Sequence, residues 1–354
     1  EFFGNPQALA ELSGSIKRNQ ISPAWIFLGP EGIGKATLAY RFARYLMSDQ
    51  QDRDNSHIET LSVSEKSPAF RQVAALSQPN LLVLRRPWNK QTKNFFTSIP
   101  VDEVRRLRSF VQTTRAGSSW RVVIIDRADD LNINSANALL KTLEEPPVNT
   151  VFLLITSVLG KLPVTIRSRC RVLKFVSMEP ADLAEAVQNV LARTPDPDPS
   201  FLELWHSEIQ TITSLAEGSV GRALQLTDKE SFSIYLTIMQ LLDSLPNVDK
   251  VELLKVCDQV VPANAGQKFE FFLNFLMEVI HRGIIFQAGK PLQVEREKNF
   301  ASRFISPHTL ELWAELWETM ARMRSEVQDL NLDKKNLIID VFHRIEELAR
   351  RSIQ

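Results

Sequence analysis

The sequence has few cysteines, no long apolar run and no net charge, and each absence excludes a class of protein. Its two cysteines, Cys170 and Cys257, cannot form a disulfide framework or a four-cysteine zinc site, which is typical of a reducing cytoplasm. No run approaches the roughly 18 apolar residues that span a bilayer, and no signal peptide is recognisable. Lysine plus arginine and aspartate plus glutamate each number 42, so any contact with nucleic acid must be local. We therefore expect a cytoplasmic protein without a membrane segment.

Strands alternate with helices in the first half of the 354 residues, and helices dominate the second. The alternation predicts a mostly parallel sheet covered on both faces. Residues 49–67 are polar and without a period, which predicts a surface loop. The proline-rich run 194–199 interrupts any helix, and beyond about residue 233 apolar helices such as 269–280 and 337–348 prevail. The predicted strands are 24–28, 81–84, 122–125, 151–155 and 172–175.

Residues 29–36, GPEGIGKA, follow one predicted strand and open a helix, the context of a phosphate-binding loop. An active loop carries serine or threonine after the lysine, because that hydroxyl coordinates Mg²⁺. Alanine stands there instead, and the next residue, a threonine, lies roughly 100° further around the helix. The alternative is a chance glycine turn. The residues assigned to this site are Gly29, Gly32, Gly34, Lys35, Ala36 and Thr37.

A second altered position follows the strand at 122–125. That strand ends in Asp126, the position of the acid that holds the Mg²⁺ shell in P-loop NTPases. The neighbouring residue is Arg127, and a guanidinium stays protonated and cannot act as a general base. Asp129 lies two residues further along the chain, and we do not expect its carboxylate to take the place of a general base at position 127. Both alterations indicate that this site does not hydrolyse ATP.

The run 132–147, NINSANALLKTLEEPP, predicts a helix that Asn134 caps and a proline pair ends. A strand follows, and after it IRSRC at 166–170. This block resembles the bacterial clamp-loader subunits of the DNA polymerase III holoenzyme, a clade of the AAA+ family. The resemblance covers about residues 3–230. The doubly altered nucleotide site is more similar to the delta-prime type than to the gamma/tau motor.

The resemblance implies three domains and a set of partners. An α/β P-loop AAA+ domain with a parallel five-stranded sheet would cover residues 1–176, a small helical lid domain 177–232, and an all-α collar domain 233–354. Over the last third of the chain, the resemblance rests only on helical character and on the stretch LNLD at 330–333. The implied partners are the gamma/tau and delta subunits, with the sliding clamp reached through the complex.

The resemblance also implies roles for single residues. Arg169 of the SRC triplet would reach in trans into the ATP site of a neighbouring subunit as an arginine finger; the alternative is a structural arginine paired with a surface carboxylate. Arg222, within GSVGRA at 218–223, would lie over the phosphates of the chain's own site as a second sensor, or be an ordinary exposed helix residue. Thr156 and Ser157 occupy the first-sensor position.

We expect at most weak binding of ATP, ADP or phosphate, because the lysine and the glycine backbone remain but a Mg²⁺ ligand is lost. We expect no zinc, because the interval between the loop and the acidic strand lacks the four cysteines that many relatives carry there. The chain would thus be a non-hydrolysing component of the polymerase holoenzyme. An ATP-hydrolysing gamma/tau-type subunit and an unrelated P-loop scaffold or nucleotide sensor are the alternatives.

Basic residues gather between positions 85 and 121, and they suit contact with the backbone of primer-template DNA. A solvated helix face that contacts a neighbouring subunit is the alternative. The five histidines show no ligand spacing, and Trp313 and Trp317 are predicted to pack in a helical core or interface. The basic residues are Arg85, Arg86, Lys90, Lys93, Arg105, Arg106, Arg108, Arg115 and Arg121.

Overall fold

The computed structural model describes residues 2–54, 57–89, 94–112, 120–194, 198–262, 268–330 and 333–353. The chain divides into two compact units, Glu1–Arg193 with Glu217–Arg222, and Thr194–Ala216 with Ala223–Gln354. The three domain boundaries expected from the sequence stay predictions. Several sequence features lie outside the described residues, namely Lys90, Lys93, Arg115, residues 195–197 of the proline-rich run and residues 331–332 of the LNLD stretch.

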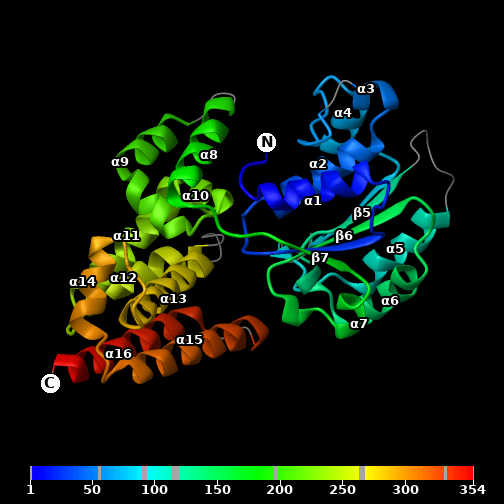
Figure 1. Ribbon diagram of the computed structural model, residues 1–354. Coiled ribbons are helices and arrows are strands. Elements are labelled where there is room, and N and C mark those ends of the chain that lie inside the picture. The colour runs from blue at the N-terminus through cyan, green and yellow to red at the C-terminus, as the bar shows by residue number, and fades with distance from the viewer. Residues whose placement is uncertain are drawn as a thin grey trace. The chain divides into compact units, whose positions relative to one another are not determined.

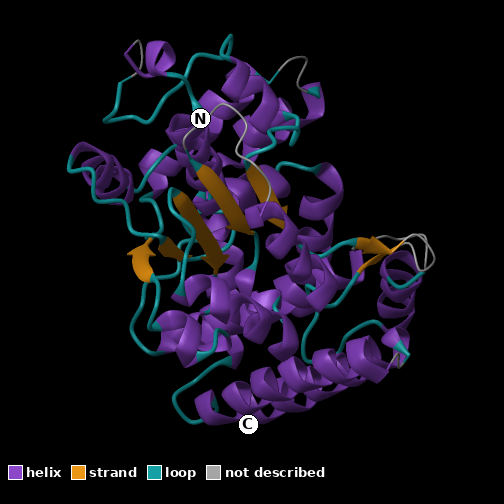
Figure 2. Ribbon diagram, turned by 90° about the vertical axis from the view of Figure 1, so that its right-hand side faces the viewer, coloured by secondary structure: helices purple, strands orange, loops and turns teal. Residues whose placement is uncertain are grey.

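A five-stranded parallel sheet forms the first unit, in the order β2-β5-β6-β1-β7 (Figures 1 and 2). This confirms the predicted parallel α/β fold and all five strands. The three central runs become strands because their side chains are buried on both faces of a covered sheet, whereas the edge strands β2 and β7 keep half-buried or exposed residues. A separate antiparallel pair joins β3 (Trp88–Asn89) to β4 (Asn94–Phe95). The main strands are β1 (Ala24–Leu28), β2 (Leu81–Leu84), β5 (Arg121–Ile125), β6 (Thr150–Thr156) and β7 (Arg171–Lys174).

Helices cover both faces of this sheet, with α1 and α2 on one side and α5, α6 and α7 on the other (Figure 1). Residues of β1 alternate between the two cores: Trp25 and Phe27 pack toward α2, and Ile26 packs toward α6. The helices of this unit are α1 (Pro6–Lys17), α2 (Lys35–Met47), α3 (Gln50–Asp54), α4 (Pro68–Ala74), α5 (Val101–Gln112), η1 (Ala128–Asp130), α6 (Ile133–Glu144), η2 (Leu159–Lys161), α7 (Val164–Arg167) and α8 (Pro180–Arg193).

Two local predictions are wrong. Helix α6 begins two residues earlier than expected, and its cap is Asn132, whose Oδ1 accepts a hydrogen bond from the Ser135 amide at 2.9 Å. Asn134 therefore lies in the first turn and caps nothing. Segment 49–67 is not only a surface loop: it contains the short helix α3, and Leu61 is fully buried in the core. The polar composition of the segment concealed Leu61 and the partly buried Ile58 and Val63, which pack against the same core cluster.

The second unit consists of helices packed around the apolar α13 (Figure 1). Trp313 is buried and its indole N–H donates to the Phe304 carbonyl at 2.8 Å, while that of Trp317 donates to the Met277 carbonyl at 3.1 Å. Both indoles thus pack within the helical core, as predicted. The remaining helices are α9 (Pro199–Ala216), α10 (Val220–Leu226), α11 (Lys229–Asp243), α12 (Lys250–Val260), α13 (Lys268–Gln287), α14 (Glu295–Phe304), α15 (Leu310–Leu330) and α16 (Lys334–Ile353).

Candidate nucleotide site

The glycine loop lies at the carboxyl edge of the sheet, between β1 and α2. Gly32 and Gly34 have φ values of 75° and 98°, which favour glycine strongly. Gly29 has another reason to be glycine: a Cβ there would lie 2.6 Å from the Phe175 carbonyl oxygen. The loop therefore has the conformation that the motif predicts, followed directly by the amino end of a 13-residue helix.

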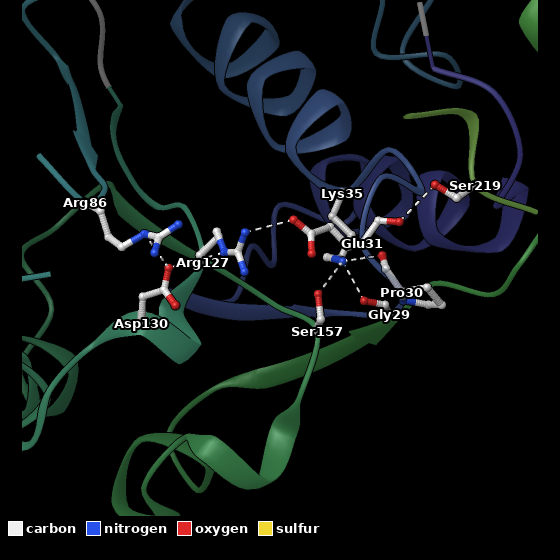
Figure 3. A network of polar contacts seen from close by, with 9 residues as sticks. All are labelled: Gly29, Pro30, Glu31, Lys35, Arg86, Arg127, Asp130, Ser157 and Ser219. Carbon is white, nitrogen blue, oxygen red and sulfur yellow. Dashed lines mark hydrogen bonds and ion pairs between the residues drawn. The ribbon is translucent and has the colours of Figure 1, made fainter. Parts of the chain in front are cut away.

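Lys35 is bound by its own loop (Figure 3). Its Nζ donates to the carbonyls of Gly29 and Pro30 at 2.5 Å each and to the Ser157 hydroxyl at 3.3 Å. The side chain is only 6% exposed. Burial lowers the pKa of Lys35 to about 8, although the nearby carboxylates of Glu31 and Asp129 oppose that shift. Ser157, at the first-sensor position after β6, therefore contacts the lysine of the phosphate loop.

Segment 217–222 binds the rest of the loop. The Ser219 hydroxyl donates to the Glu31 carbonyl at 2.9 Å (Figure 3). The Gly221 amide donates to the Gly32 carbonyl, also at 2.9 Å. A Cβ on Gly32 would clash with Ser219 Oγ, so glycine also permits this close approach. Counting the two bonds from Lys35, the four successive carbonyls of residues 29–32 all accept hydrogen bonds from this chain.

Arg222, the predicted second sensor, lies next to this contact. Its backbone amide donates to Ser219 Oγ at 3.2 Å, and its side chain is half-buried. The structure thus brings the residue to the phosphate loop. Its role toward bound phosphates stays a prediction.

The position after Lys35 serves packing rather than coordination. Ala36 is partly buried and packs against the apolar cluster beneath α2. Thr37 follows it on α2 and is half-buried. Mg²⁺ requires oxygen ligands, and a methyl group supplies none. The residues therefore fit phosphate oxygens better than they fit a metal–nucleotide complex.

Arg127 ties the turn after β5 to the phosphate loop. Its Nη1 lies 2.9 Å from Glu31 Oε1, and its Nε lies 3.3 Å from Asp130 Oδ2. Arg86 contacts the same aspartate at 3.0 Å (Figure 3). The ion pairs of Arg127 therefore hold a cation where a water-activating carboxylate would be expected. Glu31 and Asp130 were not predicted as site residues from the sequence. The three-residue spacing of Arg127 and Asp130 is nevertheless a signal that these two side chains could pair.

Asp126 lies at the end of β5, where its amide donates to the Leu84 carbonyl at 2.9 Å. Burial raises the pKa of Asp126, and the nearby cations Arg127, Arg85 and Lys35 partly offset that rise. The carboxyl therefore faces cations of the protein itself. In the described part of the chain, no group of three or more histidine, cysteine, aspartate or glutamate side chains is placed to hold a metal ion. The absence of zinc stays a prediction.

Replacing Lys35 by methionine is expected to change how stability depends on pH. Between about pH 8 and pH 10.5 the unfolded chain still holds the Lys35 proton that the folded chain has released, so rising pH favours folding. Relative to Lys35→Met, the free energy of unfolding of the wild type should increase by about 3 kcal/mol across this interval. Urea unfolding of both proteins at the two limits measures this difference. A difference that stays constant with pH would mean that the lysine is not buried as described.

Arg169 lies at the opposite edge of the sheet. It lies two residues before the start of β7, whose Arg171 pairs with Trp25 near the start of β1, whereas the loop follows the end of β1. A strand of five residues is roughly 17 Å long, so Arg169 is remote from its own phosphate loop. Its Nη2 lies 2.7 Å from Glu144 Oε1, and its Nη1 donates to the Thr165 carbonyl at 2.7 Å. The carboxylate pairing weighed from the sequence is present, and the side chain stays 35% exposed.

The arginines between positions 85 and 121 differ in their burial and in their partners. Arg121 is buried and donates to the Val111 carbonyl, so it cannot meet a phosphate backbone. On α5, Arg105 and Arg106 are exposed and pair with Asp102 and Glu103 of the first turn. Arg85 and Arg108 are exposed as well. Contact with DNA stays a prediction for the exposed members alone.

The parallel sheet, the phosphate loop and the acid after β5 define an α/β P-loop protein of the AAA+ type. Residues 4–179 match the family described as DNA polymerase III, delta subunit. This part of the chain is therefore similar to that DNA polymerase III subunit family. No helix in the described ranges is long and apolar enough to cross a membrane.

Individual relatives carry related names. The chain is 35% identical to DNA polymerase III subunit delta' of Pseudomonas aeruginosa over 153 residues, which cover 43% of each protein. It is 26% identical to DNA polymerase III subunit tau/gamma of Haemophilus influenzae, with 88% of this chain and 45% of that protein covered. It is 27% identical to subunit tau of Bacillus subtilis, with 66% and 38% covered. The chain thus spans less than half the length of these curated relatives.

Proposed function

We propose that this chain is a subunit of the DNA polymerase III clamp loader, of the delta-prime type, which acts in DNA replication without hydrolysing ATP itself. The observation that carries this proposal is the phosphate loop bound by its own chain. Lys35 and segment 217–222 occupy all four loop carbonyls from Gly29 to Gly32. Such a loop serves as a fixed structural connection and needs no nucleotide to hold it.

The chemistry of two side chains supports the absence of hydrolysis. A Mg²⁺–ATP complex would supply the phosphoryl group, with Lys35 and the loop amides as its holders. Ala36 lacks the metal-binding hydroxyl, and Arg127 pairs with Glu31 where a general base would be needed. Weak binding of ADP or phosphate remains compatible with these residues, since neither requires the missing ligand.

Arg169 would act on the ATP site of a neighbouring subunit. Its place at the amino edge of the sheet supports action in trans, because its own phosphate loop lies at the carboxyl edge. The side chain is partly exposed, and Glu144 together with the Thr165 carbonyl holds it in position. A guanidinium so placed would stabilise the charge that develops on the transferred phosphoryl group.

The proposed partners are the gamma/tau and delta subunits, and through the assembled complex the sliding clamp and primer-template DNA. The names of the relatives and the family of residues 4–179 support this assignment. A cytoplasmic location follows from the same role. Arg108, an exposed residue of α5, is the arginine that we propose for contact with the DNA backbone.

A second candidate function is the ATP-hydrolysing gamma/tau type. The relative named tau/gamma matches 88% of this chain, whereas the delta' relative matches 43%, and this difference favours the motor. The altered residues Ala36 and Arg127 oppose it. The two candidates differ in one measurable property, turnover by the chain alone.

ATP turnover by the purified chain, followed by its assembly with gamma/tau and delta subunits, tests the proposal. We expect no Mg²⁺-dependent turnover above background, the same background for Lys35→Ala, and a stable complex with the other subunits. Turnover that Lys35→Ala abolishes would establish the motor instead. Failure to assemble would refute the role as a clamp-loader subunit and favour an unrelated scaffold.

A further inference from the structure

A groove of about 380 Å³ opens beside the outermost strand of the sheet. Strand β2 stands at the end of the strand order and, among the described strands, pairs with β5 alone. Its residues Leu81 and Val83 line the groove, and Trp88 and Phe95 of the β3–β4 hairpin form another wall. The aromatic rings of the hairpin meet edge to face, with centroids 5.0 Å apart.

The hairpin exposes more apolar surface than an ordinary loop would. Trp88 and Phe95 are each 52% exposed and Phe96 is 43% exposed, and these are the exposed large aromatic residues of the described chain. Leu76 also lines the groove and is 48% exposed. Clustered exposed aromatics around a groove are typical of binding surfaces rather than of solvated loops.

The backbone of β2 offers hydrogen-bonding groups along this groove. The Val122 amide donates to the Asn80 carbonyl and the Asp126 amide to the Leu84 carbonyl, so even-numbered residues of β2 face β5. Residues 81, 83 and 85 therefore direct their peptide groups away from β5, because successive residues of a strand alternate. The Leu81 amide is already bonded to the Gln78 carbonyl at 3.0 Å, so residue 81 offers its carbonyl alone. An outward row of this kind is the template on which a further strand can pair.

The charges of the groove favour a peptide over a nucleic acid. Two of its three arginines are already paired, Arg86 with Asp130 at 3.0 Å and Arg106 with Glu103 at 2.6 Å. Arg85 is exposed and forms no ion pair within the described residues, although its charge also acts on Asp126, and it is the cation that we assign to a ligand. A phosphate backbone brings a charge with every nucleotide and needs several cations, whereas one carboxylate needs one.

We propose that the edge of β2 and the aromatic hairpin bind an extended acidic peptide, which adds a strand to the sheet. Its main chain would pair with the Leu81 carbonyl and with the peptide groups of residues 83 and 85. An apolar side chain would enter the groove between Leu76 and the hairpin, and a carboxylate would meet Arg85. This mode of recognition combines backbone hydrogen bonds for affinity with pockets for alternate side chains. The inference does not depend on the proposed function, since it involves neither the phosphate loop nor Arg169.

A displayed library of random linear peptides, roughly 5–10 residues long, tests this inference on the full chain. We expect enrichment of peptides with an apolar and an acidic residue two positions apart, because such side chains share one face of a strand. Synthetic copies should lose at least about tenfold in affinity for Trp88→Ser and for Arg85→Glu. Val251→Ser, at a 61% exposed apolar residue of α12, is the matched control and should leave the affinity unchanged.

Methylating every second amide of the peptide tests strand pairing without altering the protein. Two such sets of amides exist, and we expect methylation of the set that faces β2 to abolish binding. No enrichment, or affinity that neither Trp88→Ser nor Arg85→Glu lowers, would overturn the inference. Binding that survives methylation of either set of amides would also overturn it. A single-stranded oligothymidine that binds here with the same dependence on Trp88, in place of the peptides, would assign the surface to nucleic acid.

Discussion

Replacing Glu297 by alanine is expected to lower the free energy of unfolding by about 3–5 kcal/mol, because it removes the fully buried partner of the Arg282 guanidinium and leaves the longer contact with Glu278, at 3.8 Å. Glu297 lies on α14 and is fully buried. Its two carboxylate oxygens accept hydrogen bonds from Nε and Nη2 of Arg282 on α13, both at 2.8 Å. Tyr235 lies beside the pair; burial raises the pKa of its hydroxyl, and the charge of Glu297 adds to that rise.

Urea unfolding of the full chain measures this loss. Asp340→Ala is the matched control, since it removes the partner of Arg344 in a pair whose side chains are 40% and 47% exposed. Exposed pairs of this kind contribute about 0–1 kcal/mol. The double variant Glu297→Met with Arg282→Met should lose much less than Glu297→Ala, because it removes both charges together. Equal losses for Glu297→Ala and Asp340→Ala would contradict the importance of burial.

The strands could be predicted from the sequence because each one is a short, continuous apolar run. Such a run is typical of a strand in a sheet that is covered on both faces. It did not predict their order. The position of β1 between β6 and β7 depends on contacts between segments more than 120 residues apart, such as Ala24 opposite Phe152. No local pattern encodes such pairings. The β3–β4 hairpin was missed for a different reason, since strands of two residues show no periodicity.

At the candidate site, the motif predicted where the loop lies but not what holds it. Gly32 and Gly34 were assigned from spacing, and their positive φ values agree with that assignment. The partners of the loop come from Ser157 and from segment 217–222, which the sequence could place nearby only through the family resemblance. The ion pair between Arg127 and Glu31 was not predicted, because Arg127 was interpreted only as a residue that stands in place of a general base.

The largest expected effect concerns Arg169. In a clamp loader reconstituted with this chain, gamma/tau and delta subunits, sliding clamp and primed DNA, Arg169→Ala should lower ATP turnover by roughly 10³-fold or more at the site that receives the finger. Turnover by the other sites of the assembly would remain. The physical reason is the loss of a cation that stabilises the transition state from outside the neighbouring chain.

Two variants separate this role from a structural one. Glu144→Ala removes the carboxylate 2.7 Å from Arg169 and keeps the guanidinium, so we expect a much smaller fall in turnover. Arg171→Ala removes a nearby surface arginine that pairs with Glu11, and it should leave turnover unchanged. Equal falls for all three variants would indicate disturbed packing at this edge of the sheet.

Turnover of the reconstituted loader with wild-type chain and with Arg169→Ala, at equal amounts of assembled complex, is the most direct measurement of the central claim. We expect turnover to fall by the share that comes from the site receiving the finger, while assembly stays intact and the purified chain itself remains without turnover. Unchanged turnover in a complete complex would contradict the arginine finger and leave this chain with a scaffolding role alone.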